Sequence, residues 1–139
     1  MKINKKKKRK LIKKIILIVG GSGFLGYHLS KFFLKKKWHV ISLSLNPPSK
    51  FRKLVNVKYF NGDVSKLNQI KFLSKIKVDY VINCGGYVDH SNKKKTFNTH
   101  VNGCKNLVKI FMNKKIKTFV QIGSSTEYGS VKSPQVENK

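Results

Sequence analysis

Three glycines spaced three residues apart follow a short apolar run, and this pattern could hold a phosphate group. The run is residues 15–19, and the glycines are Gly20, Gly23 and Gly26. Gly20 would permit a tight turn, Gly23 would let the backbone approach a pyrophosphate, and Gly26 would let the next helix pack close to the strand. The positive end of that helix then faces the anion. An ordinary glycine-rich turn is the alternative. The residues expected to line the site are Gly20, Ser22, Gly23, Phe24, Leu25 and Gly26.

Polar and small residues also follow later apolar runs. Because the carboxyl ends of parallel strands meet at one edge of a sheet, we expect these residues to lie beside the glycine turn. Asp63 could accept a hydrogen bond from an adenine amino group, or it could cap the next helix. Small residues at 84–86 would let a flat cofactor lie against the backbone, or they could simply form a tight turn. The candidates are Ser44, Asp63, Val64, Cys84, Gly85 and Gly86.

The elements that must position these residues alternate between strand and helix. Apolar runs predict strands near 15–19, 38–44, 57–60, 79–84 and 117–123. Helical periodicity predicts helices near 24–36, 66–75 and 95–113. The expected apolar faces hold Leu25, Leu29, Phe32 and Phe33 in the first helix, and Phe97, Val101, Cys104, Val108 and Phe111 in the last. The pattern predicts an α/β fold with a doubly wound, Rossmann-like parallel sheet in the order 3-2-1-4-5.

Composition limits the remaining possibilities. The 139 residues suffice for one domain, which we expect over 15–139 after a basic lead-in at 1–14. The formal charge of +26 would suit an anionic partner, but the basic residues are almost all Lys and are dispersed, which favours a compositional bias. The apolar run after the lead-in is too short for an exported or membrane-spanning segment. Cys84 and Cys104 lack metal-type spacing and favour a reducing compartment, so we expect no metal site and a cytoplasmic protein.

Taken together, the motifs resemble the N-terminal part of the NAD-dependent epimerase/dehydratase family, the extended short-chain dehydrogenases/reductases that act on nucleotide sugars. The resemblance covers about 15–139. The matching segments, in the order of the family, are 20–26 (Gly-Gly-Ser-Gly-Phe-Leu-Gly), 62–64 (Gly-Asp-Val), 83–86 (Asn-Cys-Gly-Gly), 101–103 (Val-Asn-Gly) and 122–129 (Ile-Gly-Ser-Ser-Thr-Glu-Tyr-Gly). His100 stands where the family pattern has a helix Asn, and it could fill that polar role or simply be a surface histidine.

The resemblance implies a catalytic role for Ser124, whose hydroxyl would bond the substrate hydroxyl that becomes a carbonyl. Ser125 and Thr126 replace the Asp-Glu pair of dehydratases, which favours epimerase or reductase chemistry. The family's Tyr-x-x-x-Lys dyad is expected beyond residue 139, so the chain would be truncated after its fifth strand and inactive alone. Two matches to the dyad are expected to be decoys, Tyr27 with Lys31 and Tyr128 with Lys132.

The resemblance also implies NAD or NADP as cofactor and a nucleotide sugar as substrate of the complete enzyme, which would form a homodimer. Ser44 stands where NAD-binding members carry an Asp, and Lys50 and Arg52 follow, so the sequence leans toward NADP. Neither a specific nucleic acid nor a membrane is an expected partner. The alternative is a non-enzymatic basic module that binds a dinucleotide or nucleic acid.

Overall fold

Strands and helices alternate along the computed structural model, which describes residues 13–87, 89, 91–124 and 129. The strands are β1 (Ile15–Val19), β2 (His39–Ser44), β3 (Val57–Asn61), β4 (Tyr80–Asn83) and β5 (Thr118–Gln121). The α-helices are α1 (Phe24–Lys35), α2 (Leu67–Ile70), α3 (Lys93–Phe97) and α4 (Gly103–Phe111). Short segments connect them: η1 (Lys50–Arg52), η2 (Lys71–Lys75) and the π-helical η3 (Asn98–Asn102).

The sheet is parallel throughout and has the order β3-β2-β1-β4-β5. The predicted doubly wound α/β sheet in the order 3-2-1-4-5 is therefore confirmed. β1 lies at the centre, and Leu17 and Ile18 are fully buried there because neighbouring strands and helices cover both faces. The strand order reverses between β1 and β4. In open parallel sheets, ligands bind beside the carboxyl ends of strands at such a reversal.

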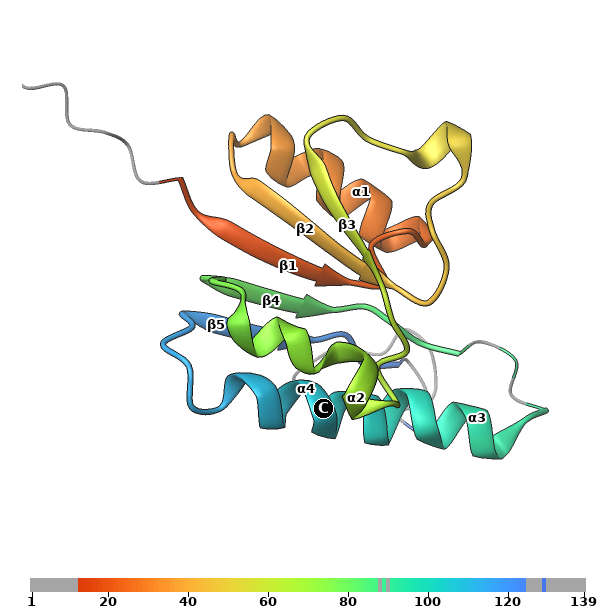
Figure 1. The fold of residues 1–139 in the computed structure, drawn as a ribbon. Coiled ribbons are helices and arrows are strands. Elements are labelled where there is room, and N and C mark those ends of the chain that lie inside the picture. Colours follow the sequence, from red (N-terminus) through yellow and green to blue (C-terminus); the bar gives the residue numbers. More distant parts are fainter. Residues whose placement is uncertain (1–12, 88, 90, 125–128, 130–139) are drawn as a thin grey trace, which may run out of the picture.

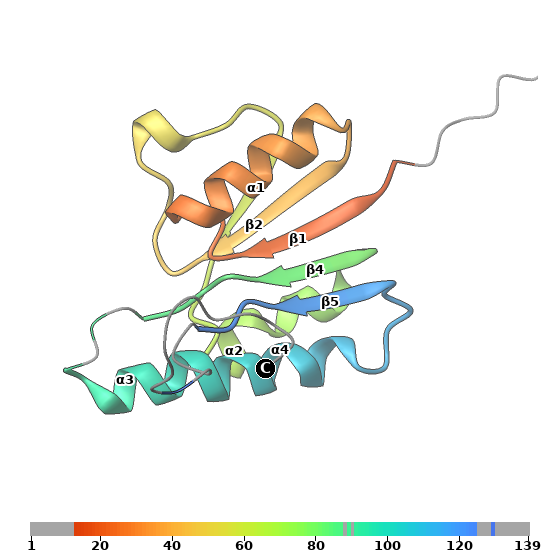
Figure 2. The same cartoon turned by 180° about the vertical axis from the view of Figure 1, so that it is seen from behind.

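Helices cover both faces of the sheet (Figures 1 and 2). Strand alternation divides the apolar side chains between two clusters. On the α1 face, Ile16, Ile18 and Val40 pack against Leu29, Phe33 and Trp38. The opposite face, below the sheet in both figures, carries α2, η2 and α4. Its core residues include Leu17, Val19, Leu43, Val81, Leu107 and Phe111.

The predicted apolar face of the first helix is partly wrong. Leu29 and Phe33 pack on the sheet, but Leu25 is 43% exposed and Phe32 is 52% exposed. The buried residues of α1 are instead Gly26 and Ser30, and the Ser30 hydroxyl donates to the Gly26 carbonyl oxygen at 2.7 Å. Small residues at these positions let the helix approach the sheet closely, and the face of α1 that meets the sheet there does not include Leu25 or Phe32.

The predicted helix at 95–113 differs in its start and its phase. The helix begins at Lys93, where the Asn92 side chain accepts from the Lys95 amide, and then passes through η3 into α4. The π turn inserts one residue and shifts the helical phase by roughly 100°. Phe97 and Val108, both predicted to be buried, are exposed. The buried stripe of α4 is Gly103, Leu107 and Phe111.

Three further expectations concern smaller segments. The helix predicted at 66–75 is one α-helical turn, α2, followed by the 3₁₀ segment η2. The fifth strand was predicted to leave Phe119, Val120 and Ile122 poorly covered. Val120 and Ile122 are exposed, but Phe119 is half-buried and packs against the core. Residues 1–12 lie outside the described part, so the lead-in over 1–14 is represented by Lys13 and Lys14, which are exposed. None of the described helices is both long and apolar enough to cross a lipid bilayer.

Candidate functional site

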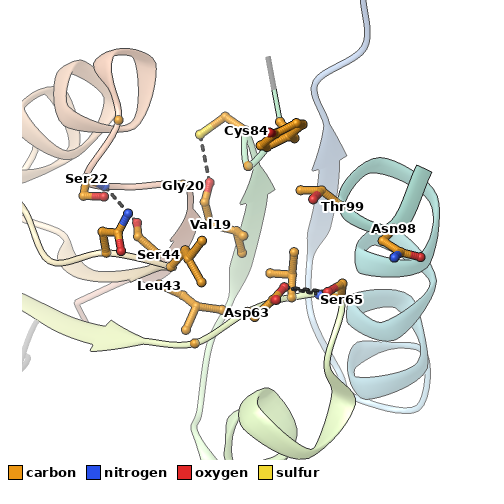
Figure 3. Close-up of a pocket in the computed structure, with 18 of the residues that line it drawn as sticks. Val19, Gly20, Ser22, Leu43, Ser44, Asp63, Ser65, Cys84, Asn98 and Thr99 are labelled. Atoms are coloured by element: carbon orange, nitrogen blue, oxygen red, sulfur yellow. Dashed lines mark hydrogen bonds between the residues drawn. The ribbon is translucent and has the colours of Figure 1, made fainter. Parts of the chain in front are cut away.

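A cavity of about 580 Å³ lies at the carboxyl ends of the strands (Figure 3). It adjoins the reversal of strand order between β1 and β4, where a ligand is expected in this class of sheet. Nine predicted site residues line it: Gly20, Ser22, Gly23, Ser44, Asp63, Val64, Cys84, Gly85 and Gly86. Residues 24–26 adjoin the cavity through the glycine turn but do not line it. The structure therefore brings together residues from four separate strand ends.

The glycine turn is fixed by close backbone packing. Gly20 has φ +77°, a conformation that side chains disfavour, and a Cβ there would lie 2.8 Å from the Gly85 nitrogen. A Cβ on Gly26 would overlap the carbonyl oxygen of Gly20. Gly23 differs, because a Cβ there would meet its nearest atom, the Gly20 carbonyl oxygen, at 3.2 Å. The fold thus requires Gly20 and Gly26, whereas Gly23 leaves space on the side of the cavity.

The backbone N–H groups at the N-terminus of α1 are available to bind an anion. Gly23 is the N-cap residue, and within the described residues no side chain caps it and no acid lies in the first turn. The first N–H groups of a helix lack intrahelical acceptors. The side chains of Phe24 and Leu25 are exposed, so these two predicted residues could serve a ligand through their backbone. This uncapped turn fits a phosphate group.

Ser44 ties the end of β2 to the glycine turn. Its hydroxyl oxygen accepts a hydrogen bond from the Ser22 amide at 3.0 Å, and the residue is 9% exposed (Figure 3). Because the oxygen accepts here, the hydroxyl proton can be donated to another group. Leu45 and Asn46, which follow Ser44, also line the cavity.

Asp63 lies on the cavity but does not cap the next helix. Its Oδ1 accepts from the Ser65 amide at 2.9 Å and from the Ser65 hydroxyl at 2.7 Å, which forms a local turn. The N-cap of α2 is Lys66, so the alternative role predicted for Asp63 is wrong. The next residue, Val64, is held from α4, because the Asn106 side chain donates to its carbonyl oxygen at 2.9 Å. No pattern in the sequence pointed to Asn106.

The turn after β4 is held by polar side chains. Asn83, which is almost fully buried, accepts from the Gly85 amide at 3.1 Å and donates to Gln121 at 2.8 Å. The Cys84 thiol donates to the Val19 carbonyl oxygen at 3.0 Å (Figure 3). Burial raises the pKa of Cys84 to about 11, so the thiol stays protonated at neutral pH. Asn83 belongs to the matching segment 83–86 but was not among the predicted site residues, although a polar residue that ends an apolar strand was a usable signal.

The opposite wall comes from the helix that begins with α3. Asn98 and Thr99 lie across the cavity from the strand ends in Figure 3. Lys95 lines the same wall, and Tyr87 adjoins it. These residues were not predicted, because the π turn that brings them to the cavity leaves no clear trace in the hydrophobic pattern.

Ser124 and the first of the two dyad matches do not line this cavity. Ser124 is exposed beyond the end of β5, and it does not line the cavity. Tyr27 and Lys31 lie on α1, also outside the lining. The other match, Tyr128 with Lys132, lies outside the described residues. Across residues 13–87, 89, 91–124 and 129, no three His, Cys, Asp or Glu side chains gather in a group that could hold a metal ion.

The sheet order, the covering helices and the cavity at the strand reversal define a Rossmann-like domain. Residues 16–139 match the model of the NAD dependent epimerase/dehydratase family, and the chain belongs to that family. It is also similar to dTDP-D-glucose 4,6-dehydratase of Dictyostelium discoideum, with 30% identity over 129 residues. That match covers 83% of this chain and 30% of the relative.

Solved structures share the fold. An epimerase, Mth375 from Methanothermobacter thermautotrophicus, superposes with a TM-score of 0.81 at 23% identity, over 91% of this chain and 40% of that one. UDP-glucose 4-epimerase from Bifidobacterium longum, in complex with NAD+ and UDP, superposes with a TM-score of 0.76 at 24% identity. That likeness covers 88% of this chain and 41% of the epimerase. The chain thus spans less than half of the length of these relatives.

Proposed function

We propose that this chain is the dinucleotide-binding part of an NAD(P)-dependent nucleotide-sugar enzyme, an epimerase, dehydratase or reductase. One observation carries the proposal: the uncapped glycine turn opens onto a cavity of about 580 Å³ at the strand reversal. Family membership supports it. The D. discoideum relative is a dTDP-D-glucose 4,6-dehydratase, and the B. longum structure contains NAD+ and UDP.

The residues present fit a dinucleotide. The first turn of α1 would bind the pyrophosphate through N–H groups next to Gly23, where a larger residue would fill the approach. Ser44 and Asp63 would bind the adenosine half, the first through its hydroxyl proton and the second by accepting from the adenine amino group. The small residues Gly85 and Gly86 would let the flat part of the ligand lie on the backbone. When bound, the nicotinamide would exchange a hydride with a sugar carbon.

The proposal includes both NAD and NADP as possible cofactors, and the residues at the end of β2 bear on the choice between them. Ser44 stands at the end of β2, where NAD-binding members carry an Asp. No carboxylate at this position would therefore repel a 2′-phosphate. Lys50 and Arg52, however, lie exposed in η1 and do not line the cavity. The B. longum epimerase is in complex with NAD+, so the comparisons give the lean toward NADP no support.

Catalysis would fall to residues outside the cavity wall. Ser124 would hydrogen-bond the sugar hydroxyl, but a hydroxyl needs an activated partner to move a proton near pH 7. Neither Tyr27 nor Lys31 lines the cavity. The Tyr-x-x-x-Lys dyad implied by the family resemblance is the expected partner in this proton transfer. A homodimer of the complete enzyme and a cytoplasmic location remain proposals. The second is supported by Cys84 and Cys104, which are both free thiols.

Calorimetric titration of Gly23→Val with NAD and NADH tests the proposal. The branched side chain would occupy the path of the pyrophosphate, so the affinity should fall at least about tenfold, which corresponds to about 1.4 kcal/mol. Lys35→Val, at the exposed end of the same helix, is the matched control and should bind as the unmodified chain does. Physiological salt limits non-specific attraction to the basic surface. Equal affinity in a folded Gly23→Val variant, or no binding by the unmodified chain, would refute the proposal.

A further inference from the structure

His100 contacts the backbone that forms the β4 wall of the cavity. It lies in η3, and its Nε2 atom is 3.2 Å from the Tyr87 nitrogen and 3.2 Å from the Tyr87 carbonyl oxygen. A Cβ on Gly86 would lie 2.7 Å from Cε1 of the same ring and 3.3 Å from Nε2. Gly86 and Tyr87 both line the cavity. One helix side chain thus packs on two consecutive residues of the wall.

The imidazole can hold this backbone in either neutral tautomer. With the proton on Nδ1, Nε2 accepts from the Tyr87 amide, and with the proton on Nε2 it donates to the Tyr87 carbonyl oxygen. Asn83 holds the Gly85 amide one step earlier in the turn. Gly86 has no side chain of its own to anchor it, and in the described part of the chain the hydrogen bonds to the Tyr87 backbone come from His100.

The π turn places His100 where it can reach this wall. The extra residue of η3 is spanned by a hydrogen bond from the Asn102 side chain to the Asn98 side chain at 2.9 Å. Asn98 and Thr99 then line the cavity, and His100 faces the turn after β4. Single π turns inside α-helices often occur at functional sites. In this chain the turn joins the helix wall to the β4 wall.

We propose that His100 is a positioning residue that holds Gly86 and Tyr87 in the shape a bound dinucleotide requires. The role rests on the proposed function, because it acts on the same cavity. His100 does not line the cavity and is exposed, so it acts through the backbone and not by touching the ligand. Losing one neutral hydrogen bond of this kind should lower dinucleotide affinity about three- to tenfold.

Two variants separate the hydrogen bond from the bulk of the side chain. His100→Ala removes both. His100→Gln keeps an acceptor and a donor at about the reach of Nε2, so it should restore most of the affinity. Lys105→Ala, an exposed position of α4 away from the cavity, is the matched control. All variants should melt within about 2 °C of the unmodified chain, because exposed positions contribute little to stability.

The experiment measures NAD and NADH affinity by calorimetry and hydrogen exchange of the Tyr87 amide by NMR without ligand. We expect faster exchange and weaker binding in His100→Ala, and recovery of both in His100→Gln. Unchanged exchange in His100→Ala, or unchanged affinity in a protein that binds the dinucleotide, overturns the positioning role. Failure of His100→Gln to recover either property overturns the hydrogen-bond explanation. If the unmodified chain binds no dinucleotide, the proposed function fails, and with it the role of His100 in dinucleotide binding. The exchange data would then report only whether His100 holds the Tyr87 amide.

Discussion

The two walls of the cavity are built by different means. On the β1–α1 side, backbone atoms leave no room for a side chain at Gly20 or Gly26. On the β4 and α4 side, polar side chains hold the backbone in place. These hydrogen bonds run from Gly85 to Asn83, from Asn106 to Val64 and between His100 and Tyr87. The first wall requires glycine, with no side chain, at Gly20 and Gly26, and the second requires particular hydrogen bonds from side chains to the backbone.

This difference separates folding from ligand binding. We call the β1–α1 side, with Gly20 and Gly26, the glycine wall. A Cβ on Gly20 must displace backbone at Cys84 and Gly85, and a Cβ on Gly26 must displace backbone at Gly20 and Gly21, so the folded state itself is destabilised. A bond removed from the other wall loosens a turn at the surface while the two apolar clusters stay intact. We therefore expect substitutions in the glycine wall to change stability, and those in the other wall to change mainly affinity. Gly23 is the exception, because its open side faces the cavity.

The largest effect is expected for Gly26→Ala. The added methyl group would overlap the Gly20 carbonyl oxygen and the Gly21 Cα atom, both in the backbone. Such overpacking costs about 3 kcal/mol, and the better helix propensity of Ala returns about 1 kcal/mol. The free energy of unfolding, measured by denaturant titration, should therefore fall by about 2 kcal/mol.

Gly23→Ala is the matched comparison for this variant. Its methyl group would meet the Gly20 carbonyl oxygen at 3.2 Å, a contact that a small shift can relieve. We expect its free energy of unfolding to stay within about 1 kcal/mol of the unmodified chain. If the two alanine variants are equally stable, the glycine wall is not fixed by backbone packing and the contrast between the walls is lost.

The glycine wall could be predicted from the sequence because its determinants are local. The positive φ of Gly20 and the contact between Gly26 and the Gly20 carbonyl oxygen follow from a strand, a tight turn and a helix in immediate succession. The close approach of Gly85 to Gly20 does not, because it comes from the turn after β4. The same holds for the sheet order, because buried strands alternating with helices leave few topologies. The close approach of α1 at Gly26 was also predicted. Its consequence for the exposure of Leu25 and Phe32 was not.

The second wall could not be predicted because its determinants are distant in sequence. Asn106 meets Val64 across 42 positions, and His100 meets Tyr87 across 13. The π turn that orients His100 also interrupts the regular helical period from which the buried face was predicted, and Phe97 and Val108 are exposed. Side-chain hydrogen bonds of this kind follow from tertiary packing, so a single sequence identifies the candidates poorly.

A smaller effect is expected at Cys84, where the two walls meet. Its thiol donates to Val19 in β1, and burial raises its pKa to about 11. The thiolate is the reactive form, and its fraction at pH 9 is therefore much lower than in the unfolded chain. In a Cys104→Ser background, iodoacetamide should alkylate Cys84 at least about tenfold more slowly in the native protein than in denaturant.

The pH dependence of this reaction follows from the direction of the pKa shift. Because the pKa is raised, the native rate should continue to increase as the pH approaches 11, above the range in which the denatured chain reaches its plateau. Equal alkylation rates in the native and denatured chain would show that Cys84 is not held against β1. The thiol would then be no part of the contact between the walls.

The smallest effect concerns the 2′-phosphate that distinguishes NADP from NAD. At the end of β2 the cavity is lined by Ser44, Leu45 and Asn46, none of which would repel a phosphate. Lys50 and Arg52 lie in η1 outside the cavity lining, and salt weakens the attraction of such exposed charges for a phosphate. The two affinities should therefore differ by less than about tenfold, or 1.4 kcal/mol, with NADP at least equal. Calorimetry with both cofactors at two salt concentrations measures this difference, and any advantage of NADP should shrink as salt increases. A tenfold preference for NAD would show that Ser44 and its neighbours select against the phosphate without an acid.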